Sequence, residues 1–233
     1  MIEMKDITKK IGDKIILKNI SFNISSGQFV TVLGPNGAGK STLFKILALL
    51  MKPTSGTLKI NGVTVNESGI ALRAKLGVIS HNSFLYDSLS ARDNLLFYAK
   101  MYGLKNAERA VKEVIQQVGL ELSYYQPVKT FSRGMLQRLA IARCLLTNPE
   151  IVLLDEPYTG LDQQAIEILN KVLKTLKTEK RTVLMITHNF EEGVTLSDRI
   201  FILNRGQLVF DEPNTYVLDT LKEIYLKKVG VFS

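Results

Sequence analysis

The sequence predicts an α/β fold built on a mostly parallel sheet, with an antiparallel β subdomain and a separate helical subdomain. Three observations support this prediction. A short apolar run at 28–34 leads into a glycine-rich loop and then an apolar, helix-like run at 43–51. Four consecutive apolar residues at 151–154 suit a strand buried on both faces of a parallel sheet. Between these segments, residues 90–147 change to helical patterns.

The remaining elements are expected in a fixed order along the chain. Residues 1–33 alternate apolar and polar side chains, with turn signals at 12–13 and 26–27, which predicts the antiparallel β subdomain. Further strands are expected at 57–60, 77–80 and 182–187, and a hairpin at 199–210. Helices are expected at 90–102, 106–118, 132–147, 162–178 and 214–228, with Asn106 as the N-cap of the second. We therefore expect one domain over 1–233, with the β subdomain and core at 1–89 and 149–233 and the helical subdomain at 90–148.

The glycine-rich loop matches G-x-x-x-x-G-K-[ST] without exceptions, between a strand and a helix. Its glycines let backbone N–H groups turn inward around phosphate oxygens, and the helix N-terminus adds its positive dipole end. Lys40 is expected to reach the β- and γ-phosphates of a nucleotide, and the Ser41 hydroxyl to ligate Mg²⁺. This predicts a P-loop NTPase core. The expected nucleotide-binding residues of the loop are Gly34, Pro35, Asn36, Gly37, Ala38, Gly39, Lys40, Ser41 and Thr42.

Two carboxylates follow the buried strand at 151–154. Asp155 is expected at the carboxyl end of this strand, where open α/β sheets bind ligands. It can hold Mg²⁺ through water, whereas the adjacent Glu156 points in another direction. We therefore assign Glu156 the role of general base that polarises the attacking water.

The segment Phe131-Ser132-Arg133-Gly134-Met135 completes a resemblance to ATP-binding-cassette (ABC) ATPases that covers nearly the whole chain. In that family the lysine loop, a signature reading LSGGQ and the strand with two carboxylates follow in this order. Ser132 and Gly134 match the signature, whereas Arg133 replaces a glycine and Met135 replaces the glutamine. Ser132 is a good N-cap for the amphipathic run that follows. The resemblance implies that this helix start binds the γ-phosphate held by a partner subunit.

Two smaller pieces fit the same family. The segment 159–162, ending at Asp162, resembles the D-loop, which in the family crosses the dimer interface beside the catalytic glutamate. His188 ends a buried strand pattern at 182–187 and resembles the switch histidine that contacts the γ-phosphate.

Two positions depart from the family. In its members an aromatic residue about thirty residues before the lysine stacks on the adenine. This chain has Ile11 at that position, which can bury apolar area on the adenine ring but lacks a π-face. His81 stands where the family has a glutamine that approaches Mg²⁺ through an oxygen. Because Mg²⁺ prefers oxygen ligands, either His81 acts through water, or Asn82 replaces it, or the metal contact is absent.

Composition limits the class of protein. No apolar stretch reaches the ~18–20 residues needed to cross a bilayer, and the charged N-terminus has no signal-peptide pattern. Both observations favour a cytoplasmic protein. Cys144 is the single cysteine and is expected to be a buried thiol. The net charge of +8 is spread along the chain, which suits an anionic membrane surface, nucleic acid, or no specific partner.

The resemblance implies an ATPase subunit that hydrolyses ATP with Mg²⁺ to drive a transporter. Two copies, identical or not, would close over two ATP molecules, and an integral membrane subunit would dock near His81 and Tyr86 at the inner face of the cell membrane. A cassette acting on nucleic acid is the alternative class, but the 115 residues between Lys40 and Asp155 leave room only for a compact helical subdomain. We therefore expect no nucleic-acid partner. Residues 80–104 and 155–162 most resemble the haem exporter ATPase of cytochrome c maturation, with drug, polysaccharide or lipid exporters as alternatives.

Overall fold

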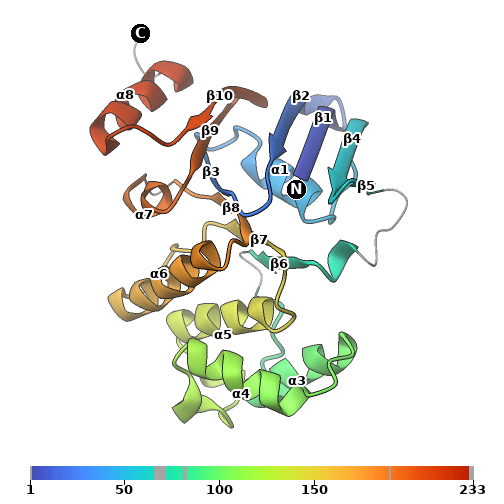
Figure 1. Ribbon diagram of the computed structural model, residues 1–233, viewed down its shortest axis with the longest axis vertical. Coiled ribbons are helices and arrows are strands. Elements are labelled where there is room, and N and C mark those ends of the chain that lie inside the picture. The colour runs from blue at the N-terminus through green and yellow to red at the C-terminus, as the bar shows by residue number, and fades with distance from the viewer. Residues whose placement is uncertain (1, 66–71, 81–82, 189, 231–233) are drawn as a thin grey trace.

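The computed structural model describes residues 2–65, 72–80, 83–188 and 190–230. Figure 1 shows the β-rich part of the molecule at one end and a group of helices, α3 to α5, at the other, with α6 beside α5. Strands β6 to β8 lie between these two parts, so the core sheet connects them.

A four-stranded antiparallel sheet with the order β2-β1-β4-β5 forms the first layer. Its strands are β1 (Ile2–Ile11), β2 (Lys14–Ile24), β4 (Ser55–Ile60) and β5 (Val63–Thr64). The predicted strand at 57–60 therefore begins two residues earlier. Gly56 is needed in this sheet because a Cβ there would lie 2.4 Å from the carbonyl oxygen of Asp6.

The core sheet has six strands in the order β10-β9-β3-β8-β7-β6. The strands from β9 to β6 in that order are parallel neighbours, and β10 is antiparallel to β9. Every residue of the three central strands is buried, as expected where both faces of a parallel sheet are covered. The strands are β3 (Phe29–Leu33), β6 (Leu76–Ile79), β7 (Ile151–Asp155), β8 (Thr182–Ile186), β9 (Arg199–Asn204) and β10 (Gln207–Pro213).

The helices begin largely where the sequence predicts. They are α1 (Lys40–Leu47), α3 (Ala91–Met101), α4 (Ala107–Gln117), α5 (Arg133–Leu145), α6 (Gln163–Thr178), α7 (Phe190–Thr195) and α8 (Leu218–Val229), with short 3-10 turns η1 (Glu121–Ser123) and η2 (Val128–Thr130). Side chains of Ser90, Ser132 and Asp162 each accept a hydrogen bond from the backbone N–H three residues on. Such caps satisfy donors that the first helical turn leaves open.

Three helices differ from the prediction. Helix α1 begins at Lys40 rather than at 43, because the glycine loop itself ends in the first helical turn. Helix α8 begins at Leu218 rather than at 214, and the short α7 was not predicted. Asn106 occupies the N-cap position of α4, but its side chain makes no capping hydrogen bond.

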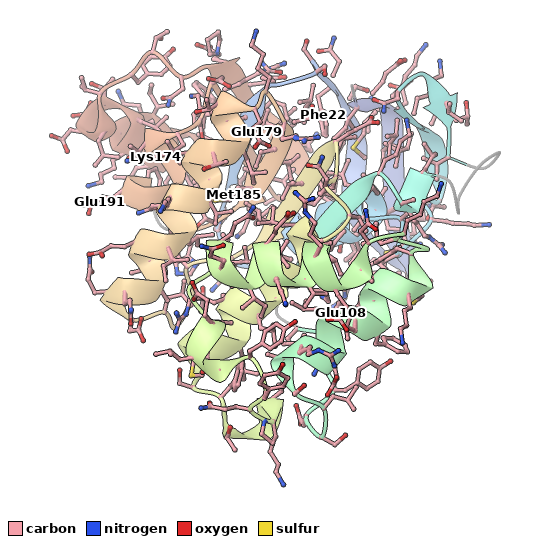
Figure 2. All side chains as sticks on the ribbon, turned by 60° about the horizontal axis from the view of Figure 1, so that its bottom comes forward. Phe22, Glu108, Lys174, Glu179, Met185 and Glu191 are labelled. Carbon is pink, nitrogen blue, oxygen red and sulfur yellow. The ribbon has the colours of Figure 1, made fainter. Side chains whose placement is uncertain are left out.

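The helices α3 to α5 share one hydrophobic cluster with the core sheet. Leu95, Val114 and Leu139 from the helices belong to the same cluster as Val152 and Met185 from β7 and β8. Met185, near the centre of the view in Figure 2, is fully buried. Cys144 of α5 also lies in this cluster, and its burial raises the pKa of the thiol to about 12. No helix of the part of the chain that the structure describes is long and apolar enough to cross a membrane.

Asn94 is a fully buried polar residue of α3. Its side-chain oxygen accepts a hydrogen bond from the backbone N–H of Tyr86 at 2.7 Å, and its amide donates to the carbonyl oxygens of Tyr86 at 2.9 Å and Ser90 at 3.0 Å. Tyr98, one turn further along α3, donates its hydroxyl hydrogen bond to the carbonyl oxygen of Phe84. These bonds fasten the 84–90 segment to the helical region.

We predict that Asn94→Ala lowers the free energy of unfolding by roughly 1–3 kcal/mol, because it leaves buried backbone groups of the 84–90 segment unpaired. Urea denaturation monitored by circular dichroism measures the change. Asn106→Ala is the matched control, since Asn106 is exposed and its side chain makes no capping bond, and its effect should stay within about 0.5 kcal/mol. Equal effects of the two substitutions would contradict the prediction.

Candidate nucleotide site

The glycine loop is held between neighbouring strands by close backbone approaches. A Cβ at Gly34 would lie 2.3 Å from the carbonyl oxygen of Leu203, the next-to-last residue of β9. Gly39 has φ +104°, and a Cβ there would lie 2.8 Å from Leu17 Cδ2 in β2. Gly37 has φ +78° and faces open space. Gly34 and Gly39 therefore position the loop, and Gly37 leaves room beside it.

Lys40 is only 9 % exposed although it carries a charge. Its Nζ donates hydrogen bonds to the carbonyl oxygens of Gly34 at 2.6 Å and Pro35 at 3.1 Å. Burial lowers the pKa of the ammonium group, and the nearby carboxylates of Glu156 and Asp155 partly oppose that shift. The amine therefore lies inside its own loop and faces two acids.

The other loop residues lie around this amine. Ala38 is buried, and its carbonyl oxygen accepts a hydrogen bond from the Gly206 N–H at 2.9 Å. Asn36 and Ser41 are exposed, and Pro35 and Thr42 are half-buried. The contact with Gly206 was not predicted: the hairpin turn at 204–206 was expected, but its approach to the loop is a tertiary feature without a local signal.

Asp155 and Glu156 lie at the carboxyl end of β7, as the sequence predicts. Asp155 is its last residue and is 8 % exposed. Glu156 has φ +51°, and its N–H donates to the carbonyl oxygen of Ile186 at 2.8 Å. This left-handed residue turns the chain sharply, so the two carboxylates take different directions.

Glu156 contacts His188 through both its side chain and its backbone. Glu156 Oε2 lies 2.7 Å from His188 Nδ1 and accepts a hydrogen bond from the His188 backbone N–H at 3.2 Å. The Glu156 side chain is 13 % exposed and the His188 side chain 67 %. The structure thus brings Lys40, Asp155, Glu156 and His188 together at the carboxyl edge of strands β3, β7 and β8, which are neighbours in the sheet.

Ser132 and Gly134 belong to a different part of the same chain. The Ser132 hydroxyl accepts a hydrogen bond from Met135 N at 3.2 Å and caps α5. A Cβ at Gly134 would lie 3.2 Å from Asp162 Oδ2, so the signature segment packs beside the 159–162 segment. Figure 1 shows α5 well apart from α1, the helix that starts at the glycine loop. One chain therefore holds the two halves of the predicted site at separate places.

Of the two positions that depart from the family, the structure describes Ile11 but not His81. Ile11 ends β1, is 50 % exposed and pairs with Lys14 across the β1–β2 turn. Further along β2, Leu17 and the carbonyl oxygen of Ile16 lie within 3.0 Å of the Cβ position of Gly39, so β2 runs past the loop. His81 and Asn82 lie outside the described residues.

The family model described as "ABC transporter" matches residues 17–159 of the chain. The chain belongs to the ABC transporter family. It is 35 % identical over 211 residues to the linearmycin resistance ATP-binding protein LnrL of Bacillus subtilis, covering 90 % of this chain and 68 % of that protein. It is 34 % identical to the Nod factor export ATP-binding protein I of Sinorhizobium fredii (90 % and 62 %) and 31 % identical to the ABC transporter ATP-binding protein NatA of Bacillus subtilis (90 % and 88 %).

Solved structures agree with this assignment. The cassette MJ0796, in a dimeric post-hydrolysis state bound to ADP and Pi, has a TM-score of 0.84 and 30 % identity, covering 93 % of this chain and all of that one. The ATP-binding subunit of an ABC transporter has a TM-score of 0.88 and 28 % identity, covering 97 % and 99 %. The predicted fold class is confirmed, and the chain is an ABC ATPase whose core is that of a P-loop NTPase.

The buried amine of Lys40 has a consequence for stability at alkaline pH. Its pKa in the folded protein is lowered below the ordinary value of 10.5. Between these two values the unfolded chain binds more protons than the folded one, so the free energy of unfolding rises with pH. We predict that, without nucleotide, the parent gains stability relative to Lys40→Met as the pH rises toward 10.5.

Urea denaturation of both proteins over this pH range tests the prediction. Lys45→Met removes an exposed lysine from the same helix and serves as the matched control. A stability difference between parent and Lys40→Met that stays constant with pH would show that the folded protein does not shift the pKa of this amine.

Proposed function

We propose that this chain is the ATP-hydrolysing subunit of an exporter, coupled to a separate integral membrane subunit. The observation that carries the proposal is the Glu156 carboxylate, held 2.7 Å from His188 Nδ1 directly after Asp155 and within the electrostatic reach of Lys40. A carboxylate shielded from solvent and placed beside a phosphate loop suits the activation of a water molecule for attack on the γ-phosphate.

The residues present fit a nucleotide with Mg²⁺. Open space beside Gly37 leaves room for a ligand next to the loop, and the backbone N–H groups of such a glycine loop suit phosphate oxygens. Ser41 supplies a hydroxyl and Asp155 a carboxylate, and oxygen ligands are what Mg²⁺ prefers. When bound, Mg²⁺ would neutralise charge on the phosphate oxygens. Lys40 would exchange its hydrogen bonds to the Gly34 and Pro35 carbonyl oxygens for bonds to phosphate oxygens, which places negative charge directly beside the buried ammonium group.

In this proposal Asp155, Glu156 and His188 have separate roles. Asp155 holds the metal side of the site. Glu156 accepts the proton of the attacking water at its carboxylate, and His188, which is mostly exposed, reaches toward the γ-phosphate. The catalytic residues are therefore Lys40, Glu156 and His188, and the metal-side residues are Ser41 and Asp155. His81, the third metal residue expected from the sequence, adds nothing to the proposal because it lies outside the described residues.

We further propose that two copies, identical or paired with a related subunit, close over two ATP molecules. Ser132 and Gly134 start a helix whose first N–H groups suit an anion, yet this helix lies apart from the glycine loop of its own chain. A second copy therefore has to supply this helix start to complete each site. Asp162, the N-cap of α6 beside Gly134, would lie at the interface. The dimeric state of the MJ0796 cassette supports this arrangement.

The membrane subunit is proposed to dock on an exposed aromatic surface that begins shortly after residues 81–82 in the sequence, at the inner face of the cell membrane. This surface contains Phe84, Tyr86, Phe97 and Tyr102, all exposed, with the rings of Tyr86 and Phe97 5.1 Å apart. The exported substrate is proposed to be a drug-like or lipid-like molecule, because relatives are named for linearmycin resistance and Nod factor export. These names give no support to haem as the substrate.

Glu156→Gln should keep ATP binding and lose hydrolysis by ~10²–10⁴-fold, the usual contribution of a general base. It should also trap an ATP-bound dimer, visible by size-exclusion chromatography. Phosphate release measures the rate, and Glu223→Gln, an exposed glutamate of α8, is the matched control. Near-parental turnover by purified Glu156→Gln would remove this residue from the role.

Ile11→Tyr should tighten ATP binding. Stacking of a base on an aromatic ring is worth ~1–3 kcal/mol, and isoleucine already recovers part of this by burial. Selectivity among bases should change little, because every base has a π-face. Calorimetry measures the affinity, with Ile15→Tyr as the matched control, since Ile15 is a second exposed isoleucine in the same strand pair. Unchanged or weaker affinity for Ile11→Tyr would place Ile11 away from the adenine.

A further inference from the structure

Arg133 is the signature residue that the resemblance to the family leaves without a role. It is the first residue of α5, directly after the capping Ser132, and it is exposed. A cation at a helix N-terminus is unfavourable with the helix dipole, and the first turn of α5 has no acidic residue to offset it. The position of the charge therefore has to be explained by what the side chain contacts.

The Arg133 guanidinium lies directly against the backbone of Gly160. A Cβ at Gly160 would lie 2.3 Å from Arg133 Cζ, 2.5 Å from Nε and 2.6 Å from Nη1. Because these three guanidinium atoms are nearly equally far from the Cβ position of Gly160, the face of the planar group covers that position. Gly160 has φ +74°, so its backbone conformation favours glycine, and a Cβ there would displace the guanidinium. Among the described residues Arg133 makes no ion pair, so the contact with Gly160 is its main interaction.

Two other residues of the same helix start contact the same segment. Gly134 packs against Asp162, with its Cβ position 3.2 Å from Asp162 Oδ2. Gln137, one turn further along α5, donates a hydrogen bond from Nε2 to the carbonyl oxygen of Pro157 at 3.2 Å. Contacts from 133, 134 and 137 thus span the whole segment 157–162. Arg133 covers its middle, and the other two contact its ends.

This segment begins at the proposed general base. The Thr159 N–H donates to the carbonyl oxygen of Glu156 at 3.2 Å, and the Leu161 N–H donates to that of Tyr158 at 3.3 Å. The Tyr158 hydroxyl is fixed to Asn170 of α6 at 2.8 Å. Thr159 and Gly160, in contrast, are exposed. Because only one short turn separates Gly160 from Glu156, a shift of the Gly160 backbone would also move the Glu156 backbone.

We infer that Arg133 is a positioning residue for ATP hydrolysis. Its guanidinium covers Gly160 and holds the 157–162 segment, so that Glu156 keeps the orientation needed to activate water. The glycine that the family has at this position has no side chain and lacks this contact. The inference rests on the proposed role of Glu156, and it makes the signature segment act on the hydrolytic site of its own chain as well as on that of a second copy.

The rival assignment is that Arg133 binds a nucleotide phosphate of the second copy. The two assignments differ in what they require of the side chain. Covering Gly160 needs a long side chain that reaches its backbone; methionine and lysine are long enough but lack the planar face, so each provides part of the contact. Binding a phosphate needs the charge, which only lysine keeps. They also differ kinetically, since loss of positioning lowers kcat and loss of phosphate binding raises KM.

Steady-state ATPase assays on Arg133→Ala, Arg133→Met and Arg133→Lys separate these assignments. Because a small misplacement of a reacting group is costly, Arg133→Ala should lower kcat about tenfold with little change in KM. Arg133→Met and Arg133→Lys should each retain more of the parental kcat than Arg133→Ala, and to a similar extent, because both side chains reach Gly160 and only one of them is charged. Parental activity in Arg133→Ala, or a raised KM that lysine but not methionine restores, would overturn the inference. Thermal unfolding of each variant verifies that it is folded.

A double-mutant cycle with Gly160 tests the contact itself. Gly160→Ala places a Cβ inside the guanidinium and should lower kcat, and adding Arg133→Ala should relieve part of that loss. The two substitutions would then be clearly non-additive; strictly additive losses would show that the two residues do not act through each other. Glu156→Gln is measured in parallel: if it keeps parental turnover, the proposed general base fails, whereas the Arg133–Gly160 cycle still reports whether the contact affects hydrolysis.

Discussion

The close approach of backbones around Gly34 and Gly39 is the constraint on which the rest of the site depends. Gly34 allows the chain to leave β3 against the carbonyl oxygen of Leu203, and Gly39 allows α1 to start against Leu17 of β2. A side chain at Gly34 would push the loop away from β9, and one at Gly39 would press on β2 and strain a backbone with φ +104°. The loop then has a fixed place, and Lys40 is buried as the first residue of α1 because of that place.

A buried amine facing two acids makes the site strongly charged. Burial works against the charge of Lys40, while Asp155 and Glu156 support it, and Glu156 already engages His188. Polyanionic phosphates suit the cation of this cluster, and a divalent cation suits its carboxylates. The charged cluster lowers the stability of the free protein and favours ligand binding, which is a common property of functional sites.

The fold and the chemical residues were predictable because their signals are local. The glycine loop, the buried run at 151–154 and the cap Ser132 each depend on neighbours a few residues away. Contacts between distant segments had no such signal: the sequence contains Arg133 and Gly160, but only the fold places the guanidinium on the glycine. The same holds for Gly206 and Ala38. The start of α1 was placed three residues late, because glycine and polar residues hide the helical turn that a phosphate loop needs.

The strand order also has a consequence for how the chain is made. β3 lies between β8 and β9 in the sheet, yet both partners follow it by about 150 residues of sequence. A ribosome adds ~5–20 residues per second, so the buried residues of β3 wait several seconds or more for either neighbour. During this time the glycine loop has no Leu203 to rest against and cannot take its final shape. Until the last third of the chain has emerged, nascent molecules therefore present an apolar strand with both edges open, which is a target for chaperones and a hazard for aggregation.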